Sequence, residues 1–315
     1  MEKLKLALLC GGDTPEREVS LSGGKQVYDA LKKDKYQITQ YDPKTDLGKL
    51  VADAPRIDAA LLILHGPNGE DGTIQGLLDL LKIPYQGSGV LGSAMAMNKV
   101  VAKRQYEQAG LPVPPYMVVE RRDAVDAGEC IRRVGLPLVV KPATCGSSVG
   151  LTIVRQADQM AEAMALGFRY DGTLLVEKYI EGLELTGGVI GNDQLDALPL
   201  IEIIPGDSFE FFDYTAKYTP GATQEICPAR IDDALTDTAQ TYAKMAHRML
   251  ACCGYSRTDM ILSGRDLFVL ETNTIPGMTA TSLFPQAAQA AGISYSDLLD
   301  RLIELGIDAA RSSAG

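Results

Sequence analysis

The sequence has no surplus of positive charge and no hydrophobic run long enough to cross a membrane. Its 315 residues carry 30 Lys and Arg against 41 Asp and Glu, a formal net charge of −11. A nucleic-acid surface needs a basic face, so this balance argues against a nucleic-acid partner, and any anion site must be local. No stretch approaches the roughly 18 apolar residues that a membrane span requires. We therefore expect neither a nucleic-acid nor a membrane partner, and the cysteine usage favours a cytoplasmic protein.

Cysteine and histidine patterns that indicate metal sites or hydrolases are also missing. The six cysteines form no C-x-x-C pair and no zinc spacing, which favours reduced thiols. The only histidines are His65 and His247, and no G-x-S-x-G elbow supports a Ser–His–Asp hydrolase. The Walker A loop and the kinase H-R-D and D-F-G signatures are absent as well. Any nucleotide chemistry must therefore use another kind of site.

Hydrophobic patterns divide the chain into two to three units. Strands alternate with helices in the first hundred residues, which predicts a parallel sheet covered by helices. Those strands are expected at 4–10, 36–42 and 59–65, and the helices at 20–33 and 73–82. Later strands are expected at 136–142, 151–154, 173–180 and 184–204, with helices near 157–169 and 231–253. A hairpin over 259–273, turning at 263–266, precedes a final helix that Ser294 and Asp297 cap.

A glycine- and serine-rich loop follows a lysine in "KPATCGSSVG", residues 141–150. Such loops wrap phosphates with their backbone N–H groups, although ordinary turns have the same composition. Lys141 and Lys178 each end an apolar strand and could face each other across a cleft. The pattern is consistent with a nucleotide clamp.

Oxygen donors gather in the hairpin near the C-terminus. Glu271 and Asn273 are two residues apart at a strand end, which places both on one face. Asp259 lies on the partner strand. This donor set suits Mg²⁺ together with substrate phosphates, but acidic strand ends leading into a turn are also common.

The stretch "GSGVLG" at 87–92 offers a competing interpretation. It fits the dinucleotide fingerprint G-x-G-x-x-G and would make the protein a dinucleotide-dependent oxidoreductase. The fingerprint normally follows the first strand of its unit, whereas this one comes late. A nucleotide-binding regulator without catalysis is a further alternative.

Six blocks in order resemble the D-alanine–D-alanine ligase family of ATP-grasp enzymes, which act in bacterial cell-wall (peptidoglycan) synthesis. They are "GGDTPEREVSLSGG" (11–24), "LHGPNGEDGTIQG" (64–76), "VKPATCGSSVG" (140–150), "FDYTAKYTPGATQEICPA" (212–229), "SRTDM" (256–260) and "ETNTIPGMTATSLFP" (271–285). The resemblance implies an α/β fold, α+β in parts, in which a parallel N-terminal pre-ATP-grasp domain precedes the ATP-grasp domains. The expected domains are 1–97 for the first D-alanine, 98–183 for the ATP lid, and 184–315 for the metal and substrate site.

The resemblance also implies the reaction and its cofactors. ATP would phosphorylate one D-alanine, and the amine of a second would attack the acyl phosphate to give D-alanyl-D-alanine. ATP and two Mg²⁺ ions, with Mn²⁺ as a substitute, are the implied cofactors, and a homodimer is the implied assembly. Sister ligases use D-lactate or D-serine as the acceptor. The "DYTAKY" loop with Tyr218 resembles the dipeptide-forming branch, which favours D-alanine.

Individual residues take roles by the same resemblance. ATP would be held by Lys99, Lys141, Ser147, Ser148, Glu177, Lys178, Tyr179, Ile180, Glu184 and Lys217. Mg²⁺ would be held by Asp259, Glu271 and Asn273. The D-alanines and the reacting atoms would be held by Glu16, His65, Ser147, Tyr218, Arg257, Gly277, Ser282 and Leu283. Two positions depart from relatives: Asn98 stands where Asp is frequent, and Cys145 occupies a loop position that is often polar or acidic.

Overall fold

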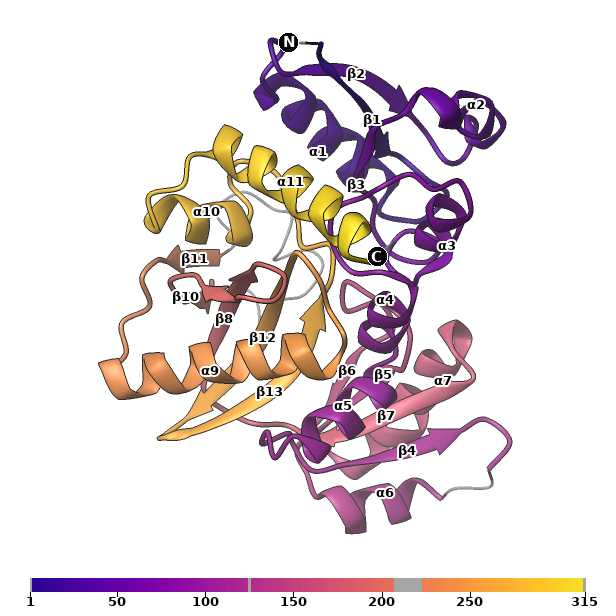
Figure 1. Cartoon of the computed structure of the whole chain (residues 1–315). Coiled ribbons are helices and arrows are strands. Elements are labelled where there is room, and N and C mark those ends of the chain that lie inside the picture. Colours follow the sequence, from indigo (N-terminus) through magenta and orange to yellow (C-terminus); the bar gives the residue numbers. More distant parts are fainter. Residues whose placement is uncertain (1, 124–125, 207–222, 314–315) are drawn as a thin grey trace.

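The computed structural model describes residues 2–123, 126–206 and 223–313, and three sheets organise that part of the chain (Figure 1). The first sheet is parallel, and the other two are built from antiparallel pairs. No helix in these ranges is long and apolar enough to cross a membrane.

The first sheet has the order β2-β1-β3, with β1 at Leu4–Cys10, β2 at Tyr36–Tyr41 and β3 at Ala59–Ile63. Strand β3 is apolar throughout and β1 is apolar and buried from Leu6 onward, as expected of a parallel sheet buried on two faces. The helices of this unit are α1 (Arg17–Ala30), α2 (Leu47–Asp53), η1 (Ala54–Arg56), α3 (Thr73–Leu80) and α4 (Val90–Met97). The predicted parallel sheet is confirmed, but α1 begins and ends three residues before the predicted helix.

The second sheet has the order β4-β7-β5-β6. Its strands are β4 (Tyr116–Glu120), β5 (Leu138–Pro142), β6 (Thr152–Val154) and β7 (Thr173–Lys178). One face is covered by α6 (Ala127–Val134) and α7 (Met160–Tyr170), the latter preceded by η2 (Ala157–Gln159). The β4 and α6 elements were not anticipated by the sequence patterns.

The third sheet has the order β11-β10-β8-β12-β13, with β9 beside β8. Its strands are β8 (Leu183–Ile190), β9 (Asp196–Ala197), β10 (Ile201–Pro205), β11 (Thr223–Ile226), β12 (Tyr255–Ser263) and β13 (Asp266–Asn273). The predicted hairpin is β12–β13, in which Ser263 pairs with Asp266 across a turn where Gly264 has φ +64°. Helix α9 (Asp233–Met249) lies between β11 and β12 in the chain, and α10 (Leu283–Ala290) and α11 (Tyr295–Ser313) follow β13. The Ser294 cap of α11 is confirmed, because its hydroxyl accepts from Asp297 N at 3.2 Å.

Helix α5 (Lys99–Gln108) lies between the second and third sheets (Figure 1). It begins at Asn98, whose side chain accepts hydrogen bonds from Val100 N and Val101 N at 3.1 Å. Tyr106 packs in the core beneath β12 and β13, whereas Val100 packs with Leu175 of β7. The helix is therefore held by both sheets at once.

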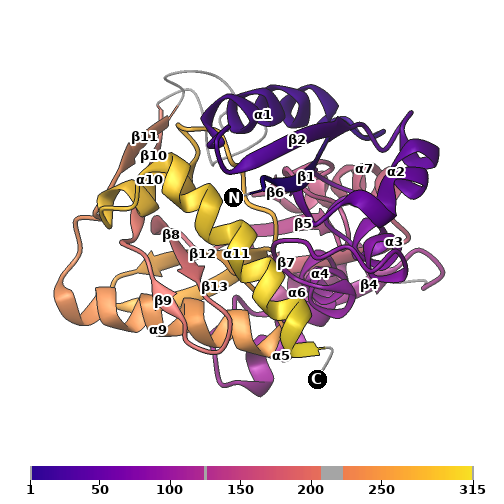
Figure 2. The same ribbon diagram turned by 45° about the horizontal axis from the view of Figure 1, so that its top comes forward.

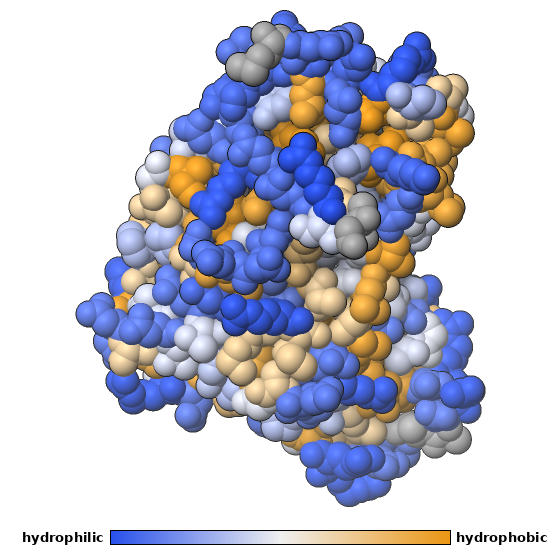
Figure 3. All heavy atoms as spheres, viewed as in Figure 1, coloured by the Kyte–Doolittle hydropathy of each residue, from blue (hydrophilic) through white to orange (hydrophobic). Residues whose placement is uncertain are grey.

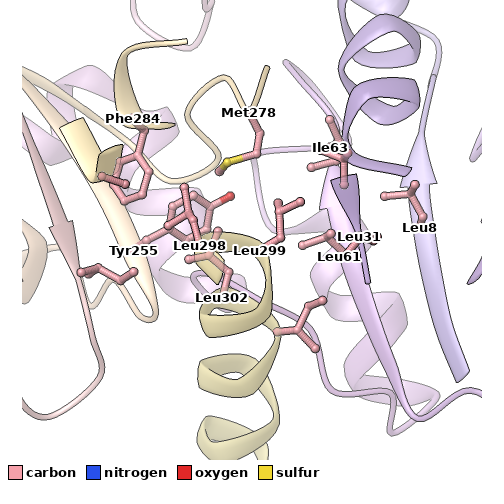
Figure 4. Close-up of a cluster of buried hydrophobic side chains, with 14 of the residues drawn as sticks. Leu8, Leu31, Leu61, Ile63, Tyr255, Met278, Phe284, Leu298, Leu299 and Leu302 are labelled. Atoms are coloured by element: carbon pink, nitrogen blue, oxygen red, sulfur yellow. The ribbon is translucent and has the colours of Figure 1, made fainter. Parts of the chain in front are cut away.

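The largest core joins the two ends of the chain. Leu61 and Ile63 of β3 share it with Leu298, Leu299 and Leu302 of α11, as Figure 4 shows. In the turned view of Figure 2, α11 runs between the first sheet and the third. Asp300 adds a polar attachment beside this core, because it contacts Lys32, Lys35 and Tyr36 of the N-terminal unit.

Apolar side chains also reach the surface in one region. The face in Figure 3 is mostly hydrophilic, and apolar spheres gather over α2–α4. Five exposed large apolar residues come from these helices: Leu47, Val51, Leu80, Val90 and Leu91. We call these residues the α2–α4 patch.

Candidate active site

Two cavities lie next to each other where the three units meet. The first is bounded by the second and third sheets and by the 143–151 loop. The second is bounded by the first sheet, α1, and the segment between β13 and α10. Lys99, Ser147 and Glu271 line both. A group bound in one cavity can therefore meet a group bound in the other at these three side chains.

The 143–151 loop has an uncommon backbone conformation. Ser147 and Ser148 have φ of +48° and +58°, values that residues other than glycine rarely adopt. Thr144 fixes the start of the loop through hydrogen bonds from its N–H and hydroxyl to Asp171, at 2.9 and 2.8 Å. The Ser147 hydroxyl donates to Glu16, which belongs to the N-terminal unit. The loop thus forms a wall between the cavities.

Lysines line the first cavity, but the expectation that Lys141 and Lys178 face each other across a cleft is wrong, because β5 and β7 are paired neighbours in one sheet. Lys141 and Lys178 both face it, and Lys99 enters from α5. The Lys99 ammonium donates to Cys145 O at 2.8 Å and lies 3.4 Å from Glu271 Oε2. Lys178 donates to Leu136 O at 2.8 Å. The cavity therefore offers several cations to an anionic ligand.

Glu177 is buried in the wall of this cavity with two lysines beside it. Lys141 contacts its Oε1, and Lys103 Nζ lies 2.8 Å from its Oε2. Burial opposes ionisation of Glu177, but the charges of Lys103 and Lys141 outweigh it and lower the pKa of the carboxyl group. Sequence reasoning did not select Lys103. Its only signal is its position four residues after Lys99, on the same face of α5.

The proposed metal ligands meet at one end of the β12–β13 hairpin. Asp259 pairs with Glu271 in the strand register, and Asn273 Nδ2 donates to Asp259 Oδ2 at 3.0 Å. Arg257 holds both oxygens of Asp259 at 2.9 Å, and Thr186 donates to Oδ1 at 2.6 Å. Asp259 and Glu271 line the first cavity.

This donor set fits Mg²⁺ if phosphate oxygens complete its coordination. Two carboxylates and one amide oxygen are ligands that Mg²⁺ prefers, and the ion commonly shares substrate phosphates. Within the described ranges, no three His, Cys, Asp or Glu side chains lie close enough to hold an ion by themselves. The phosphate oxygens of a bound nucleotide would add to the ligands that Asp259, Glu271 and Asn273 offer.

The second cavity has an acidic and a basic side. Glu16, His65 and Arg257 line it, as do Gly277, Ser282 and Leu283. Burial lowers the pKa of His65, but the neighbouring Glu70 and Glu16 raise it more, so the net shift is upward. Ser282 precedes α10 and accepts a hydrogen bond from Thr279 N at 3.1 Å. Such a cavity suits a small zwitterion.

Glu70 and Glu225 also line the second cavity and were not selected from the sequence. Glu70 lies 3.9 Å from His65 Nδ1 and accepts from Gly66 N at 2.7 Å. Burial raises the pKa of Glu225, which contacts Gln286. Glu70 belongs to the "GEDG" turn. Acidic residues are common in such turns, so nothing in the sequence indicates that Glu70 lines a cavity.

The structure brings nearly all of the predicted site residues together. Ser148, Tyr179, Ile180 and Glu184 line the first cavity as well. Lys217 and Tyr218 lie outside the described residues.

The 87–92 segment lines neither cavity. A Cβ on Gly92 would lie 2.5 Å from Ala251 O, and one on Gly87 would lie 3.2 Å from the Tyr255 ring. Close packing against the third unit therefore accounts for these glycines, and neither of the two cavities supports the dinucleotide interpretation.

This fold and site define an ATP-grasp enzyme. Two sheets of antiparallel pairs face each other across a lysine-lined cavity, and a parallel α/β unit lies next to them. Residues 40–88 match the family described as D-ala D-ala ligase N-terminus, and residues 105–304 match D-ala D-ala ligase C-terminus. The chain belongs to the D-alanine–D-alanine ligase family.

Individual relatives agree with this assignment. A D-alanine–D-alanine ligase of Syntrophobacter fumaroxidans is 64% identical, covering 98% of this chain and 99% of the relative. The ATP-complexed crystal structure of such a ligase from Bacillus anthracis has a TM-score of 0.87 at 33% identity, covering 98% and 99% of the two chains. The VanG D-Ala:D-Ser ligase of Enterococcus faecalis has a TM-score of 0.84 at 31% identity, covering 97% and 100%.

Proposed function

We propose that this protein joins two D-alanine molecules to D-alanyl-D-alanine at the expense of ATP, for peptidoglycan precursor synthesis. The observation that carries the proposal is the shared wall of the two cavities at Lys99, Ser147 and Glu271. ATP in the first cavity would place its terminal phosphate there, next to the carboxylate of an amino acid in the second. ATP would phosphorylate that carboxylate and leave as ADP.

Each charged group has a place in this scheme. Lys99 and Lys141 would bind the phosphates of ATP, and Glu16 would receive the ammonium group of the first D-alanine. Asp259, Glu271 and Asn273 would hold Mg²⁺, which supplies charge neutralisation for phosphoryl transfer when bound. The contact between Ser147 and Glu16 ties the phosphate loop to the first amino acid.

The second step needs an oxyanion site and exclusion of water. The amine of the second D-alanine would attack the acyl phosphate, lose a proton and displace phosphate. Arg257 and the N–H of Gly277 would stabilise the oxyanion of the tetrahedral intermediate. Ser282 and Leu283 would contact the second D-alanine, and the 143–151 loop would keep water from the acyl phosphate.

A different acceptor is the second candidate function. The structural likeness to a D-Ala:D-Ser ligase supports D-serine as an alternative acceptor, and D-lactate is a further alternative. These alternative reactions would use ATP and the first D-alanine in the same way and would differ only in the acceptor molecule. D-alanine is proposed because of the "DYTAKY" resemblance.

The proposal extends to assembly and location. A homodimer in which the α2–α4 patch is covered by a second copy would remove these side chains from water. Sedimentation equilibrium of the intact protein, with Leu80→Glu as the disrupting variant, tests this assembly. Fractionation of cells tests the cytoplasmic location that the resemblance implies.

Phosphate release tests the reaction itself. Purified protein with ATP and Mg²⁺ should release phosphate with D-alanine and not with L-alanine, and chromatography should identify the dipeptide. D-alanine mixed with D-serine or with D-lactate should still give mainly D-alanyl-D-alanine. Phosphate release without any ligation product would contradict the proposal, and a mixed product would favour the second candidate.

A further inference from the structure

Lys103 is a fully buried cation at the back of the first cavity. Its side chain is 0% exposed, and it enters from α5 one turn after Lys99. A lysine is almost never fully buried unless it is paired, because removing its charge from water is costly. Its partner is Glu177, whose Oε2 lies 2.8 Å from Lys103 Nζ. The side chain itself does not line the cavity.

The surroundings fix this side chain in place. The ring of Tyr116 lies 5.5 Å from the Lys103 ammonium, and the Tyr116 hydroxyl donates to Glu107 at 2.8 Å. Tyr116 is also the strand partner of Glu177, so the lysine and the carboxylate approach each other over one sheet face. Lys141 contacts the other oxygen of Glu177 from the neighbouring strand.

The charges of these three side chains do not cancel. Two lysines flank one carboxylate, so the Lys103–Glu177–Lys141 triad has a net charge of +1 when both lysines are protonated; burial lowers the pKa of Lys103, and the charge of Glu177 opposes that shift. Without Lys103, Glu177 would neutralise Lys141, and the triad would offer no net charge to a phosphate. The low dielectric of a buried site strengthens such an effect.

We propose that Lys103 is a positioning residue for nucleotide binding: it neutralises Glu177 and thereby leaves the charge of Lys141 available to the phosphates. It does not contact the nucleotide. The inference rests on the proposed function only in taking an adenine nucleotide as the ligand of the first cavity.

Calorimetric titration with ADP, in the presence of Mg²⁺ and without D-alanine, tests the proposal on the intact protein. Lys103→Met keeps most of the side-chain volume and removes the charge, and it should raise the Kd for ADP by about tenfold or more. Arg104→Met is the matched control, because it makes the same charge change on the exposed side of α5 and should leave the Kd within about twofold.

A charge-restoring variant separates this role from packing. Lys103→Met combined with Glu177→Gln again leaves a net charge of +1 and should bind ADP more tightly than Lys103→Met alone. In steady-state kinetics, Lys103→Met should raise the KM for ATP while kcat changes less than about threefold. A packing defect would not be repaired by the second substitution.

Three outcomes would overturn the proposal: wild-type affinity in Lys103→Met, no recovery in the double variant, or an equal loss in Arg104→Met. Should Lys103→Met fail to fold, Glu177→Gln is compared with the double variant. Lys141 keeps its charge without a neutralising carboxylate in both variants, so Kd values within about threefold support the proposal, although the single variant carries one more buried charge. A further tenfold loss from Lys103→Met contradicts it. Failure of the wild type to bind ADP would instead reject the proposed function.

Discussion

Arg257 and Asp259 show how one ion pair can serve two steps. They lie two residues apart on β12, so their side chains share a face, and the guanidinium grips both carboxylate oxygens. Both side chains are 12% exposed, which limits screening by water. A metal ion at Asp259 would compete with the guanidinium for the same oxygens. Arg257 already lines the second cavity, and a weaker pairing with Asp259 would let it donate to the oxyanion proposed to form there.

Replacing Arg257 with Ala should lower kcat by about 10²–10³, because one oxyanion donor is lost from the transition state. The KM for ATP should change much less. Arg257→Lys is the control that keeps the charge and loses the two-point contact. Initial rates over a grid of ATP and D-alanine concentrations measure both constants. A change confined to the KM for ATP would show that Arg257 contacts the nucleotide in the ground state.

Asp42 is a second residue with a measurable charge effect. Partial burial alone would raise the pKa of Asp42. Hydrogen bonds from Arg17 and from the backbone N–H groups of Gly12 and Lys44 have the larger effect, so the pKa is lowered to about 2. Because the folded-state pKa lies below the unfolded value of 3.8, the stabilisation is present above that value and is lost as the pH falls toward 2.

Asp42→Asn should therefore lower the free energy of unfolding at neutral pH, and the difference from wild type should shrink between about pH 4 and pH 2. Urea titrations at several pH values measure it. Asp34→Asn, at an exposed position, is the control. A difference that stays constant down to pH 2 would rule out the charge of Asp42 as its source.

At the scale of elements, the 143–151 loop and α5 act together. Lys99 reaches the loop from the first turn of α5, and Thr144 and Asp171 fix the start of the loop. The sequence predicted the loop and its lysines from residue type alone. It did not predict α5, because Val100 and Tyr106 face different cores and leave no single apolar stripe. Lys103 was missed because a helical lysine is normally exposed.

Limited proteolysis should show that ligands protect residues 142–150. ATP together with D-alanine would add contacts to the loop from both cavities, so cleavage there should fall. Asp171→Ala removes both hydrogen bonds of Thr144 and should increase cleavage without ligands, whereas Asp158→Ala on the exposed η2 turn should not. Mass spectrometry locates the cuts. Equal cleavage with and without ligands would exclude loop closure. We expect the same ligand protection for 206–226, of which residues 207–222 lie outside the described part of the chain.

At the scale of the whole molecule, the C-terminal helix binds the N-terminal sheet. Leu299 and Leu302 pack with Leu61, more than 200 positions earlier in the sequence. The sequence predicted α11 from its cap, but a local pattern cannot name the partner of an apolar face. The same limit applies to the two cavities, whose walls come from all three units. Only the family resemblance, and not the periodicity, anticipated that they meet.

Leu299→Ala should lower the free energy of unfolding by about 2–5 kcal/mol, because it leaves a cavity in this core. The two ends of the chain should still unfold in one transition, since they share the core. Glu304→Ala is the control, because Glu304 is exposed on the same helix. Urea denaturation followed by circular dichroism measures both variants. A loss below about 1 kcal/mol, or a second transition, would show that the ends are stabilised independently.

The shared wall of the two cavities has a consequence for inhibitor design. A compound that joins an adenine nucleotide analogue to a D-alanine analogue through a short linker could occupy both cavities by passing Lys99, Ser147 and Glu271. Once one half is bound, a short linker holds the other at a millimolar local concentration, which can increase affinity by about 10²–10⁴ without any new contact. A nucleotide analogue alone would also bind to many other ATP-binding proteins. The linked compound would bind with both halves only to a protein in which both cavities open onto the same three side chains.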